Sequence, residues 1–150
     1  MNKILLLLFI LFQWNYGFSC SCIGKRTVRE EFEKSDAVFE GRILSKNKFI
    51  VQDNNLPANY KMYKVEFKIL VLKKYKGSLV KDTISVITGN GGGDCGIDFI
   101  LDKSYIIYTN YSNKYFENGK EIQPFLTTDI CRRNTINNKK EQRKLKCLIK

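Results

Sequence analysis

Cysteine is the residue type with the clearest chemistry in this 150-residue chain, and its five copies are Cys20, Cys22, Cys95, Cys131 and Cys147. A thiol can bind a soft metal, act as a nucleophile or form a disulfide. Structural zinc sites need close CxxC pairs or histidine ligands, and the sequence contains neither. We therefore interpret the cysteines as a disulfide framework with one thiol left over, and the arithmetic alone leaves the pairing open.

The Cys-x-Cys spacing restricts that framework. In an extended chain Cys20 and Cys22 point to opposite sides, so they cannot easily bond each other. They are better placed to attach a short ribbon to two different later segments.

Histidine is absent, which excludes a Ser-His-Asp triad, a Cys-His pair and an HExxH zinc site. Carboxylates such as Asp94 and Asp98 remain, but a loop acid beside a disulfide is usually solvated. We expect a protein that is not an enzyme and that needs no cofactor and no metal of its own.

The first 19 residues have the features of an export signal. Lys3 precedes an unbroken apolar run of nine residues, Ile4 to Phe12, which is too short to span a bilayer. Gly17 and Ser19 place small side chains where a signal peptidase needs them, so we expect cleavage before Cys20. The alternatives are a buried core helix and a lipoprotein signal, in which Cys20 would carry a lipid anchor.

The chain is strongly basic, with 26 Lys and Arg against 15 Asp and Glu, a formal charge of +11. Lys3 is the only charged residue in the signal, so residues 20–150 keep 25 basic side chains and a charge of +10. Nucleic acid, anionic lipid or acidic polysaccharide would be compatible partners. Because the lysines are spread along the chain, we prefer a solvated basic surface, and export argues against nucleic acid.

The remaining patterns predict a single mainly β domain over 20–150. Thr27 and Glu30 form a capping box for a helix over 27–35. Strands are predicted at 37–44, 60–73, 83–88, 103–110 and 125–128, with 49–52 pairing with the first of them. Residues 137–150 read as a helix whose buried stripe is Leu145, Leu148 and Ile149. Short strands with two flanking helices suggest a small closed β-barrel.

The run GNGGGDCG at 89–96 lacks the GK[ST] ending of a phosphate-binding P-loop. Glycine also permits close approach of another backbone, so we interpret the run as a loop pressed against the disulfide partner of Cys95.

The order of these segments resembles the netrin-like module, and in particular the tissue inhibitors of metalloproteinases and their bacterial-type single-domain relatives. The resemblance rests on the Cys20-Ser21-Cys22 start and on the segments SDAVFEGRIL (35–44), YKVEFKILVLKKYKG (63–77), DTISVITGNGGGDCG (82–96), DKSYIIYT (102–109) and FLTTDICRR (125–133). It implies a five-stranded Greek-key OB-fold barrel with a short N-terminal helix and a C-terminal helix. It also implies the disulfides Cys20–Cys95 and Cys22–Cys131, with Cys147 unpaired.

The resemblance further implies inhibition of a zinc metalloendopeptidase. The α-amino nitrogen and carbonyl oxygen of Cys20 would chelate the catalytic zinc of the target and displace its water. Ser21 would point into the specificity pocket beside the zinc. The other contact residues would be Cys22, Ile23 and Gly24, with Gly93, Asp94 and Cys95 in an adjoining loop.

On this interpretation the protein is a monomer without a transmembrane helix, secreted to the extracellular space or the periplasm. Two alternatives remain open. One is a lipoprotein anchored to the cell envelope through Cys20, which abolishes chelation. The other is a non-inhibitory netrin-like module that binds a protein or polyanion, with strand aromatics in a basic groove (Tyr60, Tyr63, Phe67, Tyr105 and Tyr108).

Overall fold

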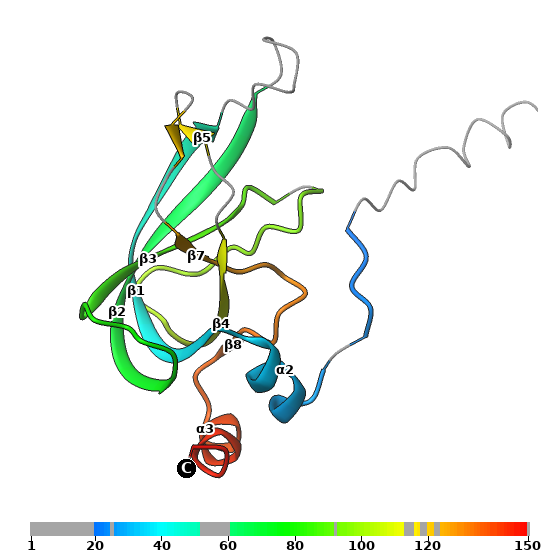
Figure 1. Cartoon of the computed structure of the whole chain (residues 1–150), viewed down its shortest axis with the longest axis vertical. Coiled ribbons are helices and arrows are strands. Elements are labelled where there is room, and N and C mark those ends of the chain that lie inside the picture. The colour runs from blue at the N-terminus through cyan, green and yellow to red at the C-terminus, as the bar shows by residue number, and fades with distance from the viewer. Residues whose placement is uncertain are drawn as a thin grey trace, which may run out of the picture.

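A computed structural model describes residues 20–24, 26–51, 61–91, 93–112, 116–117, 120–121 and 124–149 (Figure 1). The predicted signal over 1–19 lies outside these residues. Among the residues that the structure places, neither helix has the length and apolar content needed to cross a bilayer.

The described chain is mainly β, and five strands of one sheet close a ring in the order β1-β2-β3-β7-β4-β1. All neighbours are antiparallel except β3 and β7, which run parallel. The strands are β1 (Ala37–Val51), β2 (Met62–Lys76), β3 (Thr83–Gly89), β4 (Ser104–Ser112), β5 (Phe116–Glu117), β6 (Lys120–Glu121), β7 (Phe125–Thr127) and β8 (Thr135–Ile136). The short β8 adds to the edge of β4, and β5 pairs only with β6.

Strand β2 follows the alternation expected of a half-buried strand, since Val65, Phe67 and Ile69 are buried. Its partner β1 has a register shift between Glu40 and Gly41, which marks a β-bulge. A Cβ on Gly41 would overlap the side chain of Ile69, so the close approach of the two strands requires glycine.

The prediction that 49–52 pairs with 37–44 is wrong. Residues 49–51 are the end of β1 itself, and Phe49, Ile50 and Val51 pair with residues 62–64 of β2. No turn interrupts β1, because its polar residues between 45 and 48 stay in register with β2 and extend the hairpin beyond the ring. Residue 52 lies outside the described part of the chain.

Helix α2 (Val28–Lys34) begins as predicted at a complete capping box, in which Thr27 accepts from the backbone of Glu30 and the Glu30 carboxylate accepts from the backbone of Thr27. Helix α3 (Lys139–Lys146) is shorter than predicted, because Asn138 caps its start and it ends at Cys147. Leu145 is fully buried and Leu148 partly buried, but Ile149 is 42% exposed, so its place in the buried stripe is wrong. It lies beyond the last helical turn, where the periodicity no longer applies.

Two buried clusters hold these elements together. One is built from alternate residues of the ring strands, including Phe39, Phe67 and Ile107. The other joins both helices to the opposite faces of β1 and β4, through Val28, Leu145 and Tyr108 among others. This second cluster packs α2 and α3 side by side below the ring, and the first described segment runs down into α2 (Figure 1).

Candidate functional site

Residues 20–24 run as an extended segment that leads into α2. Ser21, Cys22 and Gly24 are exposed, and the side chain of Ile23 is fully exposed. Gly24 turns the chain with a φ of 61° and donates its backbone N–H to the carbonyl of Cys22 at 3.0 Å. The side chains of Ser21 and Ile23 are therefore open to solvent.

Two disulfides attach this segment to later parts of the chain. Cys20 bonds Cys95 with a Cα–Cα distance of 5.4 Å, and Cys22 bonds Cys131 with one of 5.2 Å. These are the pairs that the resemblance implies, and Cys147 is an exposed free cysteine. We call residues 20–24 and 93–95 together the N-terminal ridge.

The loop over 89–96 is organised by one carboxylate. Asp94 accepts backbone hydrogen bonds from Asn90 at 2.7 Å, Gly91 at 2.8 Å and Gly96 at 3.2 Å. Burial opposes ionisation of Asp94, but these three donors outweigh it and hold its pKa below the ordinary value of 3.8. A Cβ on Gly89 would lie 2.5 Å from the Asp94 carboxylate, so the glycines here make room for the capping group.

A turn over 129–132 contacts the ridge and supports it. The Asp129 carboxylate accepts from the backbone of Cys131 at 2.8 Å and of Arg132 at 3.0 Å. Ile130 donates its backbone N–H to the carbonyl of Cys95 at 3.0 Å. The turn therefore contacts both the Cys22 bridge and the loop that carries Cys95.

A buried carboxylate ties the turn to the chain just after the ridge. Glu31 of α2 has a side chain only 1% exposed, and it accepts from Arg26 and from Arg132, each at 3.0 Å. One acid thus holds two arginines that are more than 100 residues apart in the sequence. This group was not predicted from the sequence, although Glu31 shares a helix face with Val28 and Phe32, which is an unusual place for an acid.

A second buried acid repeats the arrangement on α3. Glu141 accepts from Arg133 Nε at 2.7 Å and Nη2 at 3.1 Å, a bidentate pair, and from the Tyr108 hydroxyl at 2.8 Å. Burial and the bond to Glu141 raise the pKa of Tyr108 well above 10. The bond to Glu141 also raises the pKa of Arg133. Arg133 in turn donates to the carbonyl of Arg26 at 3.0 Å.

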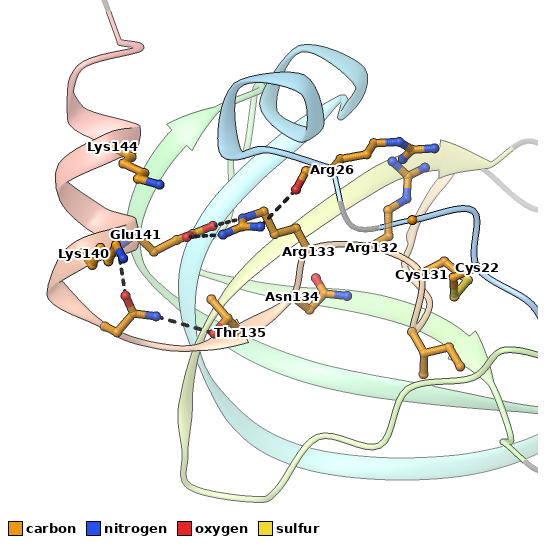
Figure 2. A pocket seen from close by; sticks show the side chains of 13 residues that line it. Cys22, Arg26, Cys131, Arg132, Arg133, Asn134, Thr135, Lys140, Glu141 and Lys144 are labelled. Carbon is orange, nitrogen blue, oxygen red and sulfur yellow. Dashed lines mark hydrogen bonds and ion pairs between the residues drawn. A yellow bond between two sulfur atoms is a disulfide. The ribbon is translucent and has the colours of Figure 1, made fainter.

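A pocket of about 720 Å³ opens between the ridge, the 129–135 segment and α3 (Figure 2). Its basic lining comes from five side chains: Arg26, Arg132, Arg133, Lys140 and Lys144. Figure 2 shows the guanidinium groups of Arg26 and Arg132 side by side, as their shared bonds to Glu31 require, with Lys140 and Lys144 on the helix across the opening. Nothing in the sequence predicts this pocket, because its parts are distant in the chain.

Three sulfur atoms, those of Cys20, Cys22 and Cys131, lie within 4.8 Å of one another. All three are in disulfides, so none is a thiolate free to bind a metal.

The structure also locates the residues that were considered for a carboxylate pair and for an aromatic ligand groove. Asp98 forms an exposed ion pair with Lys46 at 2.6 Å, while Asp94 caps its own loop, so the two carboxylates have separate partners. Three of the aromatic residues considered for a ligand groove are buried in the core: Phe67, Tyr105 and Tyr108. Tyr63 is 39% exposed, and Tyr60 lies outside the described residues.

No protein-family model matches this chain, and no curated protein matches it.

Proposed function

We propose that this chain is an exported inhibitor of a zinc metalloendopeptidase and acts through its N-terminal ridge. The observation that carries the proposal is the double attachment of an exposed extended segment at Cys20 and Cys22. Such a segment can enter the substrate cleft of a protease as a peptide does. The two disulfides already restrict the conformation of the segment, so binding costs little further conformational entropy, which favours affinity.

Removal of residues 1–19 would make Cys20 the first residue, with a free α-amine next to its own carbonyl oxygen. As in the tissue inhibitors of metalloproteinases, these two atoms would ligate the catalytic zinc and replace the water that the protease activates. An α-amine has an ordinary pKa of about 7.7–8.0, so its deprotonation near neutral pH is inexpensive. Ser21 would then enter the pocket beside the zinc, with Ile23 and Asp94 contacting the flanks of the cleft.

The proposed fold is a Greek-key OB barrel. Three consecutive antiparallel strands, β1, β2 and β3, are followed by a long connection that brings β4 back beside β1. That spatial order, β4-β1-β2-β3, supports a Greek-key arrangement. Strand β7 then fills the remaining gap between β3 and β4, which supports a five-stranded barrel.

The other residues around the ridge would serve as its support. Glu31 and its two arginines hold the chain where it leaves the ridge, and the Asp94 cap holds the loop beside it. The proposal includes secretion as a monomer and no catalytic activity of the chain's own.

The first test is intact mass and N-terminal sequencing of the protein recovered from its native host. We expect a chain of residues 20–150 with a free amine on Cys20 and four hydrogens lost to two disulfides. A diacylglyceryl and acyl adduct on Cys20 would reject chelation and leave an anchored binding module. A mature chain that starts at another residue would reject it as well.

The second test is inhibition of a panel of zinc metalloendopeptidases, with a serine protease as the negative control. A variant with one extra Ala before Cys20 keeps both disulfides but converts the α-amine into an amide. Its inhibition should weaken on the order of 100-fold or more, because a zinc ligand is lost. Equal inhibition by both forms would refute the mechanism.

Cys147→Ser is the matched control for that assay, because an exposed thiol can itself remove zinc from a protease. Inhibition that disappears in Cys147→Ser would come from the free thiol and not from the ridge.

A further inference from the structure

The pocket beside the ridge carries more positive charge than the described chain neutralises. Five basic side chains line it, while Glu141 is the one acidic residue in the described part of the lining and Glu31 lies behind it, bonded to Arg26 and Arg132. Both acids are already engaged by arginines, so three positive charges remain in excess. Within one concave surface these charges repel one another, and an anionic ligand relieves that repulsion.

Several donors in the pocket are free to bind such a ligand. Lys140 and Lys144 are exposed, one turn apart on α3, and their ammonium groups have no partner within the described ranges. Arg26 uses Nη1 for Glu31, which leaves its Nε and Nη2 without a partner among the residues that the structure describes. The acids fix the arginines in place, so the site needs little reorganisation to bind.

The rest of the lining indicates what kind of molecule carries the charge. Among the residues that the structure describes, the lining contains no aromatic ring, so a nucleobase would have no described ring to stack on. Ile130 is the one exposed large apolar side chain among the described lining residues, which is too little surface for an acyl chain. The volume of about 720 Å³ is in the range of small-molecule sites and exceeds the needs of a single inorganic ion.

We propose that this pocket binds a phosphate monoester on a small, hydroxyl-rich carrier such as a sugar or inositol. A phosphate monoester carries about −1.5 to −2 charges and three acceptor oxygens, which matches a threefold charge excess better than one carboxylate does. Arginine forks and lysine ammonium groups are the usual protein donors to phosphate oxygens. Cys22 and Gly24 of the ridge line one side of the pocket, but all of its charged donors lie outside the ridge, so the proposal does not depend on protease inhibition.

The test is calorimetric titration of the oxidised protein with glucose 6-phosphate in a phosphate-free buffer at 150 mM salt. Lys140→Gln/Lys144→Gln removes two pocket charges that have no hydrogen-bond or ion-pair partner among the described residues, and Gln preserves the helix. Lys81→Gln/Lys103→Gln removes the same charge from exposed lysines outside the pocket lining. We expect saturable binding that weakens by about tenfold in the pocket variant and stays unchanged in the control.

Two further titrations test which anionic group the pocket prefers and whether it binds that group on a free sugar or on a lipid headgroup. Glucose 6-sulfate, with a single charge, should bind more weakly than the phosphate. Phosphatidylcholine vesicles with and without a phosphoinositide test the same chemistry on a lipid headgroup, and Lys140→Gln/Lys144→Gln should weaken that binding too. Equal losses in both lysine pairs would overturn the proposal by assigning binding to overall charge. Absence of saturable binding to both the sugar phosphate and the vesicles would overturn it as well.

Discussion

Replacement of Glu31 by Gln should destabilise the protein far more than its position on a short surface helix suggests. The side chain is 1% exposed and accepts from Arg26 and Arg132, whose side chains are 40% and 18% exposed. Removing one member of a buried ion pair costs about 3–5 kcal/mol. Because Arg26 stays partly hydrated, we expect a smaller loss of about 2–3 kcal/mol. In a domain of this size that loss lowers Tm by roughly 6–12 °C.

The matched control is Glu33→Gln, which removes the same charge from an exposed position of the same helix. Its effect should stay within about 0.5 kcal/mol. Thermal unfolding of both oxidised variants at pH 7 measures the difference, and amide hydrogen exchange over residues 20–26 shows whether the ridge loosens with it. If Tm of Glu31→Gln lies within 1 °C of the control, the buried carboxylate does not hold the two arginines as argued here.

Three other perturbations follow from the same structure. Cys22→Ser/Cys131→Ser opens a loop of 109 residues and should cost about 4 kcal/mol in urea unfolding; a loss below 1 kcal/mol would contradict the entropic argument. Tyr108 stays protonated in the folded state above pH 10, where the unfolded chain ionises, so stability should fall as pH rises from 10 to 11. Tyr108→Phe should show a shallower fall. The lowered pKa of Asp94 contributes stability above pH 3.8 that is lost as pH falls through the folded-state pKa. Acid titration of Asp94→Asn should lack this component, and identical acid profiles would refute it.

Elements specified by local sequence were predicted correctly. The capping box at Thr27 marks the start of α2 because both of its hydrogen bonds involve residues three positions apart. The alternation through Val65, Phe67 and Ile69 identifies β2, since the two faces of that strand meet different environments.

Features that depend on distant partners could not be predicted in this way. The stretch 45–48 looks like a break between strands, yet pairing with β2 keeps it extended. The pocket is assembled from residues near 26, 132 and 140, whose proximity only the closed ring and the Cys22–Cys131 bridge establish. Glu31 is the clue that the sequence offers to this basic region, because it is an acid on the buried face of an amphipathic helix.

The clustering of three sulfur atoms has a consequence for how the chain acquires its bridges. During synthesis Cys22 is made 109 positions before Cys131, so the two N-terminal thiols wait for partners that appear late. Disulfide exchange requires only that a thiolate reaches a neighbouring disulfide, and the sulfurs of Cys20, Cys22 and Cys131 finish within 4.8 Å of one another. In a mispaired Cys20–Cys131 bridge, the Cys22 thiolate can therefore attack the Cys131 sulfur, form the Cys22–Cys131 bond and release Cys20 as a thiolate after the ring has closed. Wrong disulfides can thus be converted into the native pair at a late stage of folding, without unfolding of the strands.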